Sequence, residues 1–216
     1  MNRFEMVAFD CDGVLVDSEP ITFAVFTAAL NALGWRITQE EATALFVGKS
    51  FMEDVALIEK NIGGPLPADF HPRYLVERDR MLAEQVEVVR GVREVLDALI
   101  AHERPFCVAS GADIGKMQVT LGRTGLLPLF DGRMFSASHV PRSKPAPDVY
   151  LFAARSMDMQ PHRCVVIEDT PTGVRAGVAA GMTVFGYAER TDARTLLQAG
   201  ALGTFSDMRD LPALLS

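Results

Sequence analysis

Two carboxylates stand two residues apart near the start of the chain. Asp10 and Asp12, with Gly13 behind them, come directly after the apolar run 6–9, which indicates a short buried strand. Acids at the end of a buried strand repel each other and lose hydration, which is costly unless a cation offsets it. Carboxylate oxygens suit Mg²⁺, and a carboxylate can also attack phosphorus to form an aspartyl-phosphate. The pair therefore indicates a metal site or a nucleophile, and an acidic turn after a strand is the alternative without chemistry.

Polar pairs also end two later apolar runs. The pair Ser110–Gly111 follows the run 106–109, and the pair Glu168–Asp169 follows the run 164–167. Ligands of open α/β sheets bind outside the carboxyl ends of the strands, so we expect the polar residues of all three strand ends to converge. A hydroxyl and a backbone N–H can donate to phosphate oxygens, and two further acids fit a Mg²⁺ site completed across the sheet.

Lys144 supplies a positive charge for the same site. It precedes Pro145, and proline disfavours helical geometry at the residue before it, so we expect Lys144 on an extended loop that leads to a helix at Asp148. A lysine held there can reach inward, balance the acids and bind a phosphate. The alternative is an ordinary solvated lysine, which is the common state of this residue.

The elements that must position these residues fall into two groups. From residue 88 onward, apolar runs alternate with helical segments, which predicts an α/β fold with a Rossmann-like parallel sheet and helices on both faces. Between residues 18 and 87 the signals are all helical, and the helices expected there cover 20–33, 38–47, 51–62 and 69–85. We therefore expect a core domain of residues 1–17 and 88–216, with a small helical domain of residues 18–87 inserted after the first strand.

Composition limits the choice of partners and compartment. The 216 residues carry a net charge of −7, so a nucleic acid or an anionic membrane surface is not an expected partner, and an anionic substrate needs a local positive pocket. No apolar stretch is long enough for a membrane span. The three cysteines, Cys11, Cys107 and Cys164, are odd in number and lie in or beside expected buried strands. Reduced thiols of this kind favour a cytoplasmic location. We expect a monomer or a homodimer.

In order along the chain, the polar segments resemble the four motifs of the haloacid dehalogenase-like (HAD) hydrolase superfamily. The first motif, Asp-x-Asp-Gly-x-x-x-Asp, resembles residues 10–17, and the second ends in a residue like Ser110. The third and fourth resemble the segments 144–148 and 168–173. The helical insert is similar to the cap of the phosphoglycolate phosphatase and β-phosphoglucomutase branch. Within that branch the chain most resembles small bacterial sugar phosphatases of the 6-phosphogluconate phosphatase type, which share its first motif and the Lys116–Met117 pair.

This resemblance implies a Mg²⁺-dependent phosphatase acting on a small phosphorylated metabolite, such as a sugar phosphate or a phosphorylated sugar acid. Asp10 would be the nucleophile that becomes an aspartyl-phosphate, and Asp12 the general acid and base. Asp10, the Asp12 carbonyl and Asp169 would bind Mg²⁺. Glu168 would be either a further ligand or a partner of the metal-binding groups.

The resemblance also assigns the residues that would hold the substrate. Ser110, the Gly111 amide and Lys144 would bind the phosphoryl oxygens, and Lys144 would spread their charge in the reaction. Lys49 lies where the family places a specificity loop, and Glu19 is the first residue of the linker into the cap. We expect both to contribute to the choice of substrate.

Two other functions fit the same fold. A β-phosphoglucomutase-like mutase would share the core and the cap, but such relatives carry an arginine just after the specificity loop, where this chain has Phe51. A non-catalytic protein that binds phosphometabolites would be favoured by a missing catalytic group, and none is missing. Dehalogenases of the superfamily lack the acid at the position of Asp12, which argues against that reaction here.

Overall fold

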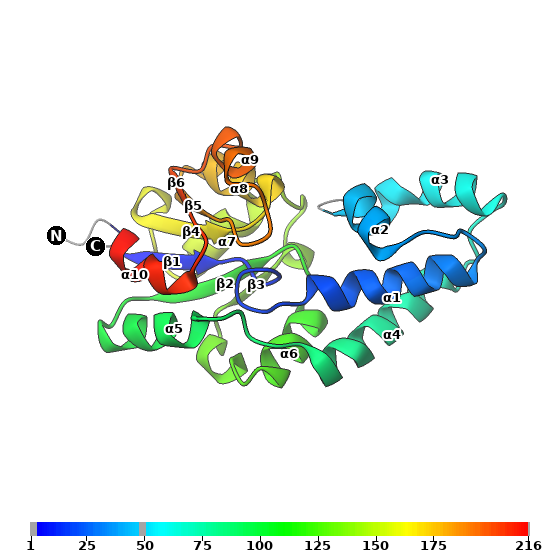
Figure 1. Cartoon of the computed structure of the whole chain (residues 1–216). Coiled ribbons are helices and arrows are strands. Elements are labelled where there is room, and N and C mark those ends of the chain that lie inside the picture. Colours follow the sequence, from blue (N-terminus) through cyan, green and yellow to red (C-terminus); the bar gives the residue numbers. More distant parts are fainter. Residues whose placement is uncertain (1–3, 48–50, 216) are drawn as a thin grey trace. The chain divides into compact units, whose positions relative to one another are not determined.

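The computed structural model describes residues 4–47 and 51–215, which form two compact units (Figure 1). The α/β unit contains the chain up to Asp17 and again from Glu87 onward, and the helical unit runs from Ser18 to Val86. No helix among these described residues has the length and apolar character that crossing a membrane requires.

The α/β unit is built on a six-stranded parallel sheet. Its strand order is β3-β2-β1-β4-β5-β6, so β1 and β4 are central neighbours from distant parts of the chain. In this order the connections leave β1 and β4 in opposite directions, which opens a crevice at the carboxyl ends of these two strands. The strands are β1 (Met6–Phe9), β2 (Phe106–Ser110), β3 (Met134–Ser136), β4 (Cys164–Glu168), β5 (Thr183–Tyr187) and β6 (Gly203–Phe205).

Helices cover both faces of this sheet, which explains why its central strands are continuous apolar runs. Alternate residues such as Met6, Ala8 and Val166 join a core with α7, α8 and α9, and Figure 1 shows α5 and α6 on the opposite side of the sheet. The predicted parallel α/β fold is thus confirmed. The helices are α5 (Val92–Ala101), α6 (Ile114–Arg123), α7 (Asp148–Ser156), α8 (Pro171–Ala179), α9 (Ala193–Gln198) and α10 (Leu211–Leu214). Short 3-10 turns lie at Leu127–Phe130, Ala137–His139, Pro161–Arg163 and Met208–Asp210.

The helical unit has an aromatic core of its own. Phe26 meets Phe46 with ring centroids 5.1 Å apart, and Leu30, Ile58 and Phe70 are buried around them. Its helices are α1 (Glu19–Ala32), α2 (Gln39–Phe46), α3 (Phe51–Ile62) and α4 (Phe70–Gln85). The unit therefore has an apolar interior separate from that of the sheet.

The start of α2 illustrates how local sequence sets an element. The Thr38 side chain accepts a hydrogen bond from the backbone N–H of Glu41, and the Glu41 carboxylate accepts one from the Thr38 N–H at 2.8 Å. This reciprocal capping box satisfies two N–H groups that a helix end otherwise leaves unpaired.

Candidate active site

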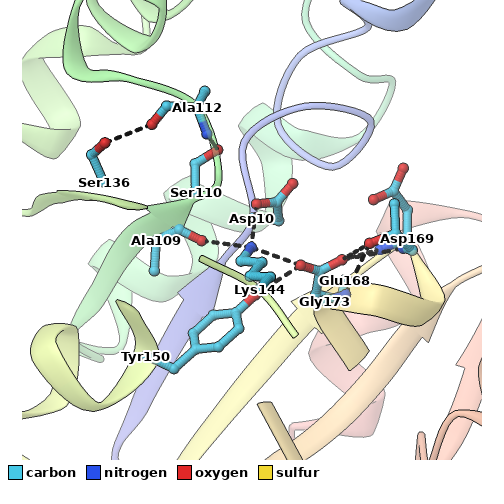
Figure 2. Close-up of polar contacts among 11 residues, drawn as sticks. Asp10, Ala109, Ser110, Ala112, Ser136, Lys144, Tyr150, Glu168, Asp169 and Gly173 are labelled. Carbon is cyan, nitrogen blue, oxygen red and sulfur yellow. Dashed lines mark hydrogen bonds and ion pairs between the residues drawn. The ribbon is translucent and has the colours of Figure 1, made fainter. Parts of the chain in front are cut away.

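Three strand ends bring their polar residues to the crevice between β1 and β4. Phe9 pairs with Ile167, so the next residue, Asp10, lies level with Glu168, and the Asp10 N–H donates to the Ile167 carbonyl at 3.0 Å. Ser110 ends β2 on the other side of β1. Figure 2 shows these side chains at one edge of the sheet. The register of a parallel sheet therefore gathers residues that are more than a hundred positions apart in the chain.

Lys144 is at the centre of this cluster. Its ammonium donates to Asp10 Oδ1 at 2.6 Å, to Glu168 Oε1 at 2.7 Å and to the Ala109 carbonyl at 3.0 Å (Figure 2). The side chain is only 9% exposed. An ammonium has three N–H donors, and all three are directed at protein oxygens. Lys144 thus points inward, and its direct contacts are with the acids.

The hydrogen bonds of Glu168 leave it little capacity for another ligand. Its Oε1 accepts from Lys144 and from the Tyr150 hydroxyl at 2.9 Å. Its Oε2 accepts from the backbone N–H groups of Asp169 and Thr170, both at 3.1 Å, and from the Thr170 hydroxyl at 3.0 Å. A carboxylate has about four lone-pair sites, and these five donors occupy them. Glu168 is thus tied to its neighbours through both carboxylate oxygens.

Two glycines allow this close packing. A Cβ on Gly173, in the first turn of α8, would overlap the Glu168 carboxylate. A Cβ on Gly13 would overlap the Asp169 carboxylate, and Gly13 also has a φ of 75°, a conformation that other residues rarely adopt. Glycine at both positions lets the backbone approach the acids directly.

The charges of the cluster do not balance. Oxygens of Asp10, Glu168 and Asp169 lie within 4.8 Å of one another, and all three residues are buried. When all four groups are ionised, the three carboxylates and the Lys144 ammonium together carry a net charge of −2. Burial raises the pKa of Asp10 to about 7, although the nearby charge of Lys144 opposes the rise. A divalent cation that prefers oxygen ligands, such as Mg²⁺, fits this donor set and would restore the balance.

Lys144 itself remains charged. Burial lowers its pKa, but the charges of Asp10 and Glu168 outweigh burial and hold the pKa well above its ordinary value. The ammonium also lies 4.7 Å from the centre of the Tyr150 ring, whose π face attracts a cation. The lysine is thus a fixed positive charge between two acids.

The loop after β2 presents donors beside the cluster. The Ser110 Oγ accepts a hydrogen bond from the Ala112 N–H at 3.0 Å, and the Ala112 carbonyl accepts one from Ser136 at 2.7 Å (Figure 2). Gly111 is exposed, and no atom lies within 4 Å of the place where its Cβ would be. A hydrogen bond from Ser136 in β3 therefore anchors the loop at Ala112, while Gly111 stays accessible to a ligand.

The comparisons with known proteins agree with this arrangement. A model of the haloacid dehalogenase-like hydrolase family matches residues 4–181. The chain is a haloacid dehalogenase-like hydrolase. The hydrolase is 30% identical over 215 residues to a 6-phosphogluconate phosphatase of Escherichia coli (strain K12), which covers 99% of this chain and 96% of that relative. It is 32% identical to a fructose-1-phosphate phosphatase of the same strain, over 83% of this chain and 94% of the relative.

Solved structures give the same result. A HAD family hydrolase from Deinococcus radiodurans R1, determined with bound phosphate and sodium, superposes on this hydrolase with a TM-score of 0.84. The two chains are 33% identical, and the match covers 100% of this chain and 96% of the other. The predicted family and hydrolase class are thus confirmed.

Two side-chain contacts of this hydrolase were not predicted from the sequence. A cis peptide bond between Lys144 and Pro145 was not predicted either. The Tyr150 hydroxyl binds Glu168, and the Lys116 ammonium lies 2.8 Å from Asp12 Oδ1. In the sequence, Tyr150 resembles the other apolar residues of an amphipathic helix, so nothing there indicated a contact with Glu168. Lys116 is part of the Lys116–Met117 pair, and the structure places it at a buried position of α6.

The residues expected to select the substrate belong to the inserted segment. Glu19 is the first residue of α1 and is partly buried, and Lys49 lies outside the described residues. Their roles stay predictions. The helical unit also contains a hollow of about 920 Å³ between α1 and α4, lined mainly by apolar side chains such as Ala28, Phe70 and Val76. No buried cluster of acids like that of the α/β unit lines this hollow among the described residues, so we assign it no reaction.

Proposed function

We propose that this hydrolase is a Mg²⁺-dependent phosphatase that cleaves a small phosphorylated sugar or sugar acid through an aspartyl-phosphate on Asp10. The observation that carries the proposal is the buried cluster of Asp10, Glu168 and Asp169 around Lys144, at the sheet edge where α/β proteins bind ligands. Both curated relatives named above are phosphatases of phosphorylated sugars or sugar acids, which supports a phosphoric monoester hydrolase.

Asp10, Asp169 and the Asp12 carbonyl are the groups that would hold Mg²⁺. When bound, the ion supplies positive charge to the phosphoryl oxygens and to the attacking carboxylate. Glu168 contributes by fixing Lys144 and the Asp169 backbone, to which it is hydrogen-bonded. Lys144 holds Asp10 by Oδ1 and thereby fixes the orientation of the carboxylate for attack.

The chemistry then divides between the two acids of the first motif. Asp10 forms a bond to phosphorus while the bond from phosphorus to the substrate oxygen breaks. The departing oxygen keeps the electron pair and takes a proton from Asp12. Asp12 next removes a proton from the water that attacks the aspartyl-phosphate, which releases phosphate and restores Asp10. General acid–base help of this kind contributes roughly 10²–10⁴-fold in rate.

The loop after β2 would hold the phosphoryl group in place. The Ser110 Oγ already accepts from the Ala112 N–H, so its own proton remains for donation to a phosphoryl oxygen. The exposed N–H of Gly111 is a second donor. Positioning and electrostatic stabilisation account for most of the catalysis in phosphoryl transfer, which suits a site made of fixed donors and charges.

Glu19 and Lys49 are proposed to contact the part of the substrate beyond the phosphate. A cytoplasmic location is also proposed, and it is supported by three cysteines that are free and buried. The expectation of a monomer or homodimer stays a prediction.

The proposal is tested by assaying p-nitrophenyl phosphate, 6-phosphogluconate and fructose 1-phosphate with Mg²⁺ and with EDTA. We expect turnover only with the metal, and a loss of at least about a thousandfold in Asp10→Asn, because removing a nucleophile removes the whole covalent route. Asp97→Asn, at an exposed position of α5, is the matched control and should keep full activity. Metal-independent turnover, or an active Asp10→Asn variant, would contradict the proposal.

The same experiment separates the alternatives. A mutase would interconvert hexose 1- and 6-phosphates with little release of inorganic phosphate. A non-catalytic binding protein would show a measurable dissociation constant for a phosphometabolite and no turnover with any member of the panel.

A further inference from the structure

Lys116 occupies a position that is unfavourable for a positive charge. It lies in the first turn of α6, where the helix dipole is positive and repels a cation. Its side chain is only 11% exposed, and burial of an ammonium is costly unless it is paired. Both effects oppose a lysine here, so its presence requires a partner that offsets them.

That partner is the second acid of the first motif. The Lys116 ammonium lies 2.8 Å from Asp12 Oδ1, and the Asp12 side chain is 23% exposed. An ammonium only donates hydrogen bonds, so Oδ1 must act as an acceptor. Lys116 therefore holds the Asp12 carboxyl group at Oδ1.

The backbone of Lys116 is anchored from both sides. Its N–H donates to the side chain of Asp113, the N-cap of α6, at 2.9 Å, and its carbonyl accepts from the Thr120 hydroxyl at 3.1 Å. The Thr120 hydroxyl also lies 4.0 Å from the Cys11 sulfur. Two successive residues of the first motif thus contact two residues one turn apart on α6, which fixes the helix against the segment that carries Asp12.

We propose that Lys116 is a positioning residue that holds the Asp12 carboxyl group by Oδ1 in the orientation from which it delivers a proton to the departing oxygen. This inference rests on the proposed function. As Asp10 bonds to phosphorus and the old P–O bond breaks, the electron pair stays on the departing oxygen and a proton moves to it from Asp12. Without Lys116 the carboxyl group loses this contact, and proton delivery becomes less efficient.

The test compares esters that need this proton to different degrees. 2,4-Dinitrophenyl phosphate releases a stable anion, p-nitrophenyl phosphate is intermediate, and phenyl phosphate releases a strongly basic oxygen. For Lys116→Met, which keeps the apolar stem and removes the charge, we expect kcat/KM with phenyl phosphate to fall about 10- to 100-fold, part of what acid catalysis supplies. The ratio kcat/KM is compared because it reports formation of the aspartyl-phosphate, whereas kcat also contains its hydrolysis, which is the same for all three esters. With 2,4-dinitrophenyl phosphate the fall should be less than about twofold. Lys60→Met, at an exposed position of α3, is the matched control and should behave like the wild type with all three esters.

A double-mutant cycle separates positioning from a structural role. In an Asp12→Asn background the lysine has no acid to position, so adding Lys116→Met should change kcat/KM with phenyl phosphate by less than about twofold. If the two losses multiply, or if Lys116→Met slows all three esters equally or not at all, the inference is wrong. Lys116→Gln, measured in the same cycle, serves if the methionine variant does not fold. Absence of Mg²⁺-dependent turnover in the wild type would instead refute the proposed function.

Discussion

At the scale of single residues, Tyr150 shows how a buried hydroxyl can fix an acid. Its O–H donates to Glu168, and we expect Tyr150→Phe to cost about 1.5–3 kcal/mol of unfolding free energy, the usual contribution of a hydrogen bond to a charged group. Tyr187→Phe is the matched control, because the Tyr187 hydroxyl binds the exposed Glu189 at 3.1 Å and should matter less. Urea denaturation of both variants measures the difference, and equal losses would contradict this account.

Asp10 predicts a dependence of stability on pH. Its pKa is 3.8 in the unfolded chain and, because of burial, about 7 in the folded, metal-free protein. Between these pH values the unfolded state binds fewer protons, so the stability contributed by this group falls as pH rises and levels off above pH 7. The change is on the order of 4 kcal/mol.

The side chain of the Asp10→Asn variant does not ionise in this pH range. The variant should therefore gain stability relative to the wild type as pH rises. We expect the difference in unfolding free energy, measured by urea denaturation in EDTA, to grow between pH 4.5 and pH 8 in favour of the variant. A difference that is independent of pH would show that burial does not raise the pKa. A difference that grows with pH, as expected, would also mean that the wild type is less stable because it keeps an ionisable group at this position.

The sequence predicted that Asp10, Ser110, Lys144 and Glu168 belong to one site, because each follows an apolar run or precedes a proline. The structure brings Lys144 into contact with Asp10 and Glu168. Their partners could not be selected in that way. The bond from Tyr150 to Glu168 depends on how α7 packs against the sheet, and tertiary packing of this kind has no local pattern.

At the scale of elements, the first turn of α8 controls how close the chain comes to the acids. We expect Gly173→Ala to cost about 1–3 kcal/mol, the usual range for overpacking, because its Cβ must displace the Glu168 carboxylate. The activity of the Gly173→Ala variant should also fall, because the displaced Glu168 carboxylate loses its hydrogen bond to Lys144.

Gly122→Ala in α6 is the control for this change. Its Cβ would meet only the Leu127 side chain, at an ordinary 3.9 Å, so this variant should gain about 0.5–1 kcal/mol from higher helix propensity. Thermal unfolding and the phosphatase assay compare the two. A Gly173→Ala variant as stable and active as Gly122→Ala would mean that the close approach of α8 to Glu168 is not required.

Most elements were predictable for a physical reason. The central strands β1 and β4 are covered on both faces, so nearly all of their residues are apolar. The capping box of Thr38 and Glu41 marks the start of α2 directly. Short strands with few apolar residues, such as β6 with its sequence Gly-Thr-Phe, carry a weaker signal. The order of strands beyond β1 and β4 depends on how connections cross the sheet, which local sequence does not specify.

At the scale of the whole molecule, the net negative charge of the buried acid cluster links metal binding to stability. A ligand that binds only the folded state stabilises it, by about 2.7 kcal/mol at a concentration 100 times Kd. We expect Mg²⁺ to raise the melting temperature of the wild type. Asp169→Asn should abolish the shift, because Asp169 belongs to the buried acid cluster. Scanning calorimetry measures both proteins, with Asp97→Asn as a control that should respond like the wild type. An equal shift in Asp169→Asn would place the cation elsewhere.

The insertion of the helical unit after β1 has a consequence for protein synthesis. Met6 pairs with Cys164 and Val7 with Phe106, so a nascent chain that has just left the ribosome has no partner for its first strand. Ser18–Val86, with an aromatic core of its own, is complete long before β4 has been translated. We expect stalled nascent chains ending near residue 130 to protect the helical unit from protease while β1 remains cleavable. Biogenesis would then begin with the insert, and the edge that carries Asp10 and Glu168 would assemble late.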